Sequence, residues 1–154
     1  MTTTINYDRL PDLTGADLGH SAYRTVTQEQ VNLFADATDD HQWIHTDPRR
    51  AAAGPYRSTV AHGFLTLSLL PALARGLYRV EGVRMGVNYG LNRVRFPAPL
   101  PTGSAVRATA EIAQVDPVPG GVQLVARVTV RTDGGSKPCC VAETVSRLYA
   151  EAPR

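Results

Sequence analysis

An apolar segment over residues 63–77 constrains the fold of this chain more than any other feature. Apolar residues occupy nearly every side of the helix that this segment would form, which predicts a buried helix rather than a surface one. Pro71 lies inside the segment and should kink the helix or shift its register. The segment is shorter than the roughly 20 apolar residues needed to cross a bilayer. We therefore expect a helix in the core of a soluble domain.

The residues after this segment carry the two-residue period of antiparallel strands. Val106, Ala108, Ala110 and Ile112, for example, alternate with polar or charged residues. Glycines in the first strand, at positions 86 and 90, predict bulges. The four predicted strands cover residues 83–96, 105–115, 122–130 and 139–149.

The residues before the segment predict an N-terminal arm, a short strand and two helices. The arm covers residues 1–20, and the strand covers residues 23–27. Thr27 and Gln30 fit a capping box for a helix that ends near Thr38, and Asp47-Pro48 fits the start of another. One apolar helix wrapped by a curved antiparallel sheet is the hot-dog arrangement. We thus expect one α+β domain over residues 1–154.

Charge and cysteine content exclude several classes of function. The net charge of +2 is too small to indicate nucleic-acid or membrane-surface binding. Cys139 and Cys140 are adjacent, so they favour two reduced small residues over a disulfide. The first residues have neither the basic start nor the apolar core of a signal peptide. These observations predict a cytoplasmic protein.

A carboxylate and an imidazole that are five residues apart, Asp40 and His45, follow the first predicted helix. Such a pair can hold and activate a water molecule. Gly63 begins the apolar helix, where a free N–H can hold a carbonyl oxygen. Gln42 and His62 are candidates for supporting roles beside them. Together these groups favour addition of water across a double bond conjugated to a thioester.

A metal site is the alternative interpretation of the same stretch. His41 and His45 are four residues apart, and Asp40 or Asp47 could complete a two-histidine, one-carboxylate site. Histidines at that spacing share a face only on a helix. The turn signals at residues 39–40 and 47–48 predict no helix between them, so we expect no metal.

Three stretches resemble MaoC-like proteins. The sequence Ala-Thr-Asp-Asp-His-Gln-Trp-Ile-His-Thr-Asp-Pro (37–48) resembles their hydratase-2 motif, with an aspartate followed five residues on by a histidine. Val-Ala-His-Gly-Phe-Leu-Thr (60–66) is similar to the signature that opens their central helix. Residues 88–100 resemble the strand and proline-rich turn that follow. The His-Gln-Trp-Ile-His version is most similar to the NodN-like branch, which includes (R)-specific enoyl-CoA hydratases.

The resemblance implies that Asp40 and His45 are an acid–base dyad and that the Gly63 N–H binds the thioester oxygen. It implies reversible hydration of trans-2-enoyl thioesters to (R)-3-hydroxyacyl thioesters, without metal or redox cofactor. Coenzyme A or an acyl-carrier phosphopantetheine would carry the substrate. The chain departs from the family pattern at three positions. Many members have glycine, asparagine and proline where this chain has Asp39, Gln42 and Trp43.

The substrate's acyl tail is expected beside the apolar helix, near Phe64, Leu67 and Leu70. Arginines at positions 57, 93 and 95 could meet coenzyme A phosphates. A long sheet with an exposed edge also predicts a homodimer joined edge to edge. A hot-dog thioesterase stays open as an alternative, although residues 63–78 lack the carboxylate it usually needs. A specialised dehydratase and a non-catalytic acyl-binding subunit also stay open as alternatives.

Overall fold

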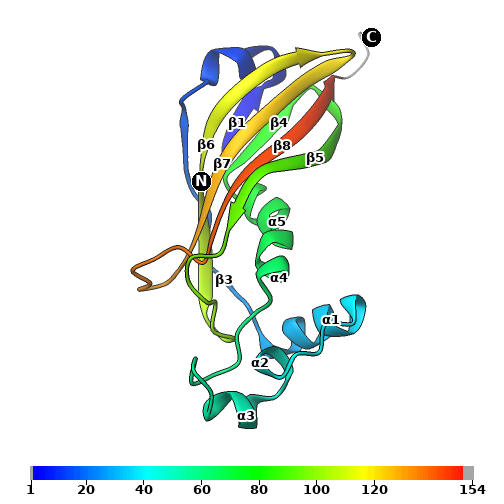
Figure 1. Ribbon diagram of the computed structural model, residues 1–154. Coiled ribbons are helices and arrows are strands. Elements are labelled where there is room, and N and C mark those ends of the chain that lie inside the picture. The colour runs from blue at the N-terminus through cyan, green and yellow to red at the C-terminus, as the bar shows by residue number, and fades with distance from the viewer. Residues whose placement is uncertain (1, 151–154) are drawn as a thin grey trace.

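The computed structural model describes residues 2–150 and has the expected α+β hot-dog fold (Figure 1). Its helices are α1 (Gln28–Thr38), α2 (Trp43–Thr46), α3 (Pro48–Ala52), α4 (Gly63–Ser68) and α5 (Leu70–Ala74), with a 3-10 helix η1 (Tyr7–Leu13) before them. Its strands are β1 (Thr3–Asn6), β2 (Asp17–His20), β3 (Arg24–Thr25), β4 (Tyr78–Glu81), β5 (Val83–Arg95), β6 (Ala105–Val118), β7 (Gly121–Thr132) and β8 (Cys140–Ala150). Within this part of the chain, no helix is long and apolar enough to cross a membrane.

A six-stranded antiparallel sheet in the order β2-β6-β7-β8-β5 forms the main layer, and β3 also pairs with β6. Figure 1 shows this sheet curving around α5 and α4, while α1, α2 and α3 lie beyond its end. The predicted alternation in β6 is confirmed, because Val106, Ala108, Ala110 and Ile112 are all buried. Their side chains face the helices and form the core together with Leu65, Leu70, Leu73 and Leu77.

The central helix is divided into α4 and α5 at Leu69. Pro71 lies in the first turn of α5, where its missing N–H removes no helical hydrogen bond. Burial is also less complete than the sequence predicted. Phe64 is 70% exposed, and Ser68 and Pro71 are exposed on the same side. An apolar face of the central helix therefore lies uncovered in a single chain.

The predicted N-terminal arm is folded onto the domain and contains regular elements. β1 pairs in parallel with β4, which the sequence analysis did not predict. β2 pairs with β6 and extends the main sheet at its edge. Leu10 and Leu18 are buried in the core cluster, so the arm contributes apolar contacts as well as backbone pairing.

β5 is the other edge of the main sheet and is irregular. Its pairing with β8 shifts register three times, including between Asn88 and Gly90 and between Leu91 and Arg93. The bulge expected near Gly90 is confirmed, whereas Gly86 pairs regularly with Leu148. Because each bulge reverses which side chains face the helices, these irregularities decide where the residues of β5 point.

Candidate active site

Asp40 follows the C-terminus of α1, and the backbone there has an unusual conformation. α1 begins with the predicted capping box of Thr27 and Gln30 and ends at Thr38, with Asp39 as its C-cap. Asp39 has φ of 58°, in the left-handed region that glycine favours. This explains why glycine fits the position before the aspartate in many MaoC-like proteins. The Asp40 carboxylate that follows is about half exposed, at 52%.

The conformation of Asp39 gives a first prediction. We expect Asp39→Gly to raise the free energy of unfolding by about 0.5–1 kcal/mol, because glycine adopts positive φ without a steric cost. The Asp39 side chain is fully exposed, and its carboxylate lies 4.0 Å from Nε2 of His41. Activity should not change. Urea denaturation of the two proteins measures the difference, and a less stable variant would contradict this account of the departure.

His45 is buried, with 8% exposure, in the one-turn helix α2. Its Nδ1 lies 2.6 Å from the Val60 carbonyl oxygen, which can only accept a hydrogen bond. Nδ1 therefore carries the proton in the neutral ring, and Nε2 is left as an acceptor. Burial lowers the pKa of His45 below its usual value, and the nearby His62 acts in the same direction. The Val60 hydrogen bond and the Asp40 charge oppose that shift without reversing it.

His62 joins the segments that carry Asp40 and His45. It is 2% exposed and lies directly before α4. Its Nε2 lies 2.9 Å from the Asp40 carbonyl oxygen and 4.0 Å from an Asp40 carboxylate oxygen. Its ring stacks on the His45 ring, with 3.8 Å between the centroids, and also contacts Phe34. His62 thus fixes the Asp40 backbone against the His45 ring.

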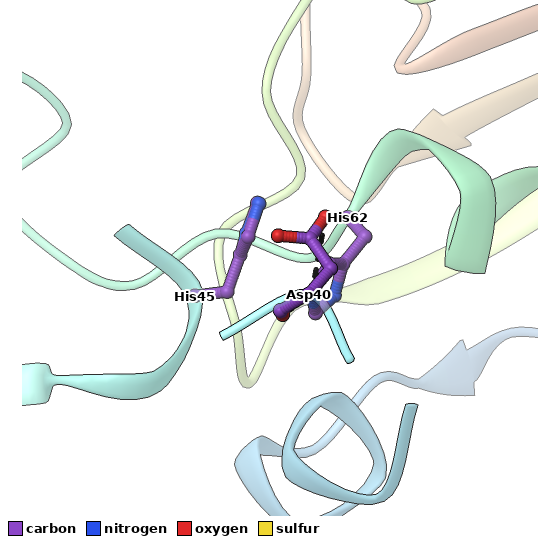
Figure 2. A group of neighbouring side chains, drawn as sticks. All are labelled: Asp40, His45 and His62. Carbon is purple, nitrogen blue, oxygen red and sulfur yellow. Dashed lines mark hydrogen bonds and ion pairs between the residues drawn. The ribbon is translucent and has the colours of Figure 1, made fainter. Parts of the chain in front are cut away.

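Asp40, His45 and His62 converge from three separate segments, as Figure 2 shows. One carboxylate oxygen and one nitrogen from each imidazole lie within 4.8 Å of one another. Among the buried side-chain nitrogen and oxygen atoms of residues 2–150, Nδ1 of His62 is the one without a hydrogen-bond partner. The structure therefore brings the two residues of the expected dyad together with His62, one of the two residues expected to support them, which is 22 residues from Asp40.

The rejected metal pair is also separated in space. The argument that no helix lies between residues 40 and 47 was wrong, because α2 occupies Trp43–Thr46. His41 nevertheless lies outside the cluster, near the carboxylates of Asp36 and Asp39, and is half exposed. Asp40, His45 and His62 are residue types that can ligate a metal. The expectation that no metal binds stays a prediction.

Gly63 and His45 line one hollow of about 350 Å³, together with residues of the loop after β5. Gly63 is the first residue of α4, and the N–H groups of a first turn have no acceptor within their own helix. A Cβ at Gly63 would lie 2.9 Å from the Phe96 ring, so only glycine fits without a shift. The hollow is lined by Ile44, His45, Tyr56, Val60, Ala61, Gly63, Thr66, Phe96, Pro97, Ala98, Pro99, Leu100 and Cys139.

The other predicted residues are distributed differently. Gln42 accepts the His45 N–H through its backbone oxygen, while its exposed side chain has no hydrogen bond within residues 2–150. Leu67 lines a separate hollow of about 490 Å³ between the central helices and β5. Phe64 points outward and packs edge-on against Phe96. Arg57 is exposed in the loop after α3 and has φ of 61°.

Arg93 and Arg95 point away from the dyad. Arg93 pairs with Glu143 and Arg95 with Val141, next to Ala142, which is buried and faces the core. Since neighbouring residues of a strand face opposite sides of the sheet, both arginines lie on the outer face. The sequence pattern alone could not show this, because the bulges reset the alternation within β5.

Comparison with known proteins defines the class to which this fold and site belong. Residues 10–133 match the family described as the MaoC like domain, and this chain belongs to that family. Several of its relatives and structural neighbours are named dehydratases or hydratases, which are hydro-lyases, and the chain is an enzyme of that class.

Two curated relatives are similar over nearly their whole length. The 3-hydroxyacyl-thioester dehydratase Z of Mycobacterium tuberculosis (strain ATCC 25618 / H37Rv) is 56% identical over 137 residues, covering 88% of this chain and 91% of that protein. Nodulation protein N of Rhizobium leguminosarum bv. viciae is 43% identical over 141 residues, covering 89% of this chain and 87% of that protein. The similarity to the NodN-like branch is thereby confirmed.

Solved structures show the same fold at low identity. The monoamine oxidase regulatory protein from Archaeoglobus fulgius has a TM-score of 0.75 and 24% identity, covering 99% of both chains. The (R)-hydratase from A. caviae has a TM-score of 0.67 and 23% identity, covering 88% of this chain and 96% of that one. These likenesses support the hot-dog fold alone.

Proposed function

We propose that this protein catalyses the reversible hydration of trans-2-enoyl thioesters to (R)-3-hydroxyacyl thioesters, with Asp40 and His45 as the acid–base dyad. The observation that carries the proposal is the position of His45. The His45 ring lies near the Asp40 carboxylate, and His45 also lines the hollow that Gly63 lines. The residue proposed as proton carrier and the residue proposed as backbone donor therefore line the same space.

The separation within the dyad suits one shared water. The carboxylate oxygen of Asp40 and a nitrogen of His45 lie within 4.8 Å of each other. A water that makes one hydrogen bond to each group spans a gap of about this size. Because Nδ1 of His45 is engaged by Val60, Nε2 is the nitrogen that can accept a proton. We assign His45 as the base toward water and Asp40 as the residue that orients it.

In the forward reaction, the water oxygen forms a bond to C3 of the enoyl group while His45 takes one water proton. The electron pair of the double bond moves toward the thioester oxygen, where the Gly63 N–H would stabilise the charge. C2 then receives the proton from the dyad on the same face, which makes the addition syn. Dehydration runs through the same steps in reverse.

The lowered pKa of His45 predicts an acidic limb in the pH profile. The neutral ring is the base, and burial favours that form, so kcat/KM should be constant near pH 7 and fall below a midpoint under 6.5. Because the unfolded chain binds this proton more readily, the free energy of unfolding should also fall on acidification. Initial rates measured across the pH range at constant ionic strength test the predicted fall of kcat/KM. A midpoint above 6.5 would contradict the assignment of His45.

The stereochemistry of the product tests the proposed function. Crotonyl-CoA should be converted to 3-hydroxybutyryl-CoA, and chiral chromatography of the hydrolysed product should give the (R) acid. The (S) acid would place water attack on the opposite face of the substrate from the one proposed. Hydrolysis to crotonate with release of thiol would instead indicate the thioesterase.

We also propose that the protein is a homodimer that pairs through the edge strand β5. Several apolar residues of β5 are exposed, and one of them, Leu91, lines a hollow together with Ser68 and Pro71 of the uncovered helix face. Contiguous apolar surface on a sheet edge is typical of an interface. The exposed apolar residues are Met85, Val87, Tyr89 and Leu91.

Light scattering measures this directly. The wild-type protein should have twice the 16.6 kDa mass of one chain. Replacing Val87 and Tyr89 with lysine should yield a species of single-chain mass, because lysine on an edge strand opposes pairing. A wild-type monomer would contradict the homodimer. Isolation from cells of a larger complex with a different chain would also contradict it.

A further inference from the structure

The outer face of the sheet holds a hollow of about 340 Å³ that the mechanism does not use. Three of its lining residues are arginines, and one is a glutamate. It lies over the end of β5, opposite the side on which α4 and α5 pack. Its lining residues are Arg93, Arg95, Pro97, Arg127, Val141, Ala142 and Glu143.

The charges around this hollow are unbalanced. Arg127 pairs with Glu111 outside it, at 3.2 Å. Glu143 accepts a hydrogen bond of 2.8 Å from the Asn92 amide. Across residues 2–150, no carboxylate lies within ion-pair distance of Arg93 or Arg95. Two guanidinium groups of one sign therefore border a concave surface, which attracts an anion.

The hollow adjoins the one that contains His45. Pro97 lines both, and Phe96 lies between Pro97 and the outward-facing Arg95 while its ring covers Gly63. The chain thus passes from the arginines on the outer face to the wall of the catalytic hollow within three residues. A flexible thioester arm that crosses Pro97 would connect the two.

We propose that Arg93 and Arg95 bind phosphate on the carrier of the acyl chain, which is coenzyme A or a phosphopantetheine. This inference rests on the proposed function, since it assigns the anion to the same substrate. Guanidinium groups bind phosphate oxygens through charge-assisted, often bidentate hydrogen bonds. The apolar surface of Pro97 lies where the uncharged pantetheine would cross.

The test compares one acyl group on carriers with and without phosphate. In Arg93→Glu/Arg95→Glu, the KM for crotonyl-CoA should rise by about tenfold or more, the scale of losing charge-assisted contacts. The kinetics with crotonyl-pantetheine, which has no phosphate, should match those of wild type. Both arginines are exposed, so the variant is expected to fold. Equal KM values for crotonyl-CoA in the two proteins would overturn the proposal.

A matched charge reversal controls for the overall field. Arg75→Glu/Arg79→Glu changes the net charge equally beside a different hollow, near β4. The KM of this control for crotonyl-CoA should stay at the wild-type value. A rise equal to that of Arg93→Glu/Arg95→Glu would show that net charge alone causes the effect and would overturn the proposal. Arg93→Lys/Arg95→Lys keeps the charge and should restore much of the affinity.

Further measurements separate the sources of phosphate and the two proposals. Crotonyl-phosphopantetheine tests the phosphate common to coenzyme A and carrier proteins. A KM rise confined to crotonyl-CoA places the contact on its nucleotide phosphates, whereas a rise with both places it on the shared phosphate. If no thioester loses its enoyl group, the proposed function fails. Calorimetric binding of coenzyme A, weakened by the charge reversal, would then still support the phosphate site, and unchanged binding would exclude it.

Discussion

Asp40→Asn and His45→Gln should each lower kcat/KM for crotonyl-CoA hydration by about 100-fold or more, the scale of losing a general acid–base group. Asparagine keeps the shape of Asp40 but removes the negative charge that orients water. Glutamine at position 45 can still donate an N–H toward Val60, but its amide cannot accept a proton near neutral pH. Neither change empties volume in the core, so circular dichroism and the unfolding midpoint should remain near wild type.

Adjacent residues supply matched controls for these substitutions. Asp39→Asn removes a neighbouring carboxylate that is fully exposed, and asparagine tolerates the left-handed backbone there. His41→Gln removes an imidazole that lies outside the cluster. Both controls should keep wild-type kinetics. Near wild-type activity in Asp40→Asn or His45→Gln would show that the dyad is assigned wrongly.

Gly63→Ala is the second change with a large expected effect. Its Cβ would lie 2.9 Å from the Phe96 ring, a separation that requires a shift of the ring or of the start of α4. Displacing a pre-aimed donor by about 1 Å costs on the order of 100-fold in rate. We therefore expect kcat to fall by about that factor, measured with crotonyl-CoA at saturation.

Two further variants separate a steric from a general effect of alanine. Gly90→Ala, on β5, places a Cβ with no heavy atom within 4 Å and should be active. Gly63→Ala combined with Phe96→Leu relieves the contact and should recover part of the lost rate. An unchanged kcat in Gly63→Ala alone would contradict the placement of the oxyanion donor.

The parts of this fold that depend on local signals were predictable. The capping box of Thr27 and Gln30 fixed the start of α1, and strict alternation identified the buried face of β6. Asp40 and His45 were found together because they are only five positions apart in the sequence. In each case, the property lies within a few residues of sequence, where capping and periodicity act.

Other parts depend on contacts that no local pattern encodes. β1 and β4 have only four residues each and pair across more than seventy residues. The contact of His62 with Asp40 follows from how α4 approaches the end of α1. Arg93 and Arg95 were associated with the substrate by residue type, but the bulges at residues 88–93 set them on the outer face. A bulge changes which face of the sheet each later side chain of the strand lies on, so one extra residue moves the whole remaining segment to the opposite pattern.

The measurement that most directly tests the dyad mechanism follows enoyl absorbance and free thiol together. Wild-type protein is mixed with crotonyl-CoA and with a longer trans-2-enoyl-CoA, in parallel with Asp40→Asn. The account predicts loss of enoyl absorbance without thiol release, and loss of that activity in the variant. Thiol release by the wild type, or equal enoyl loss in both proteins, would contradict it.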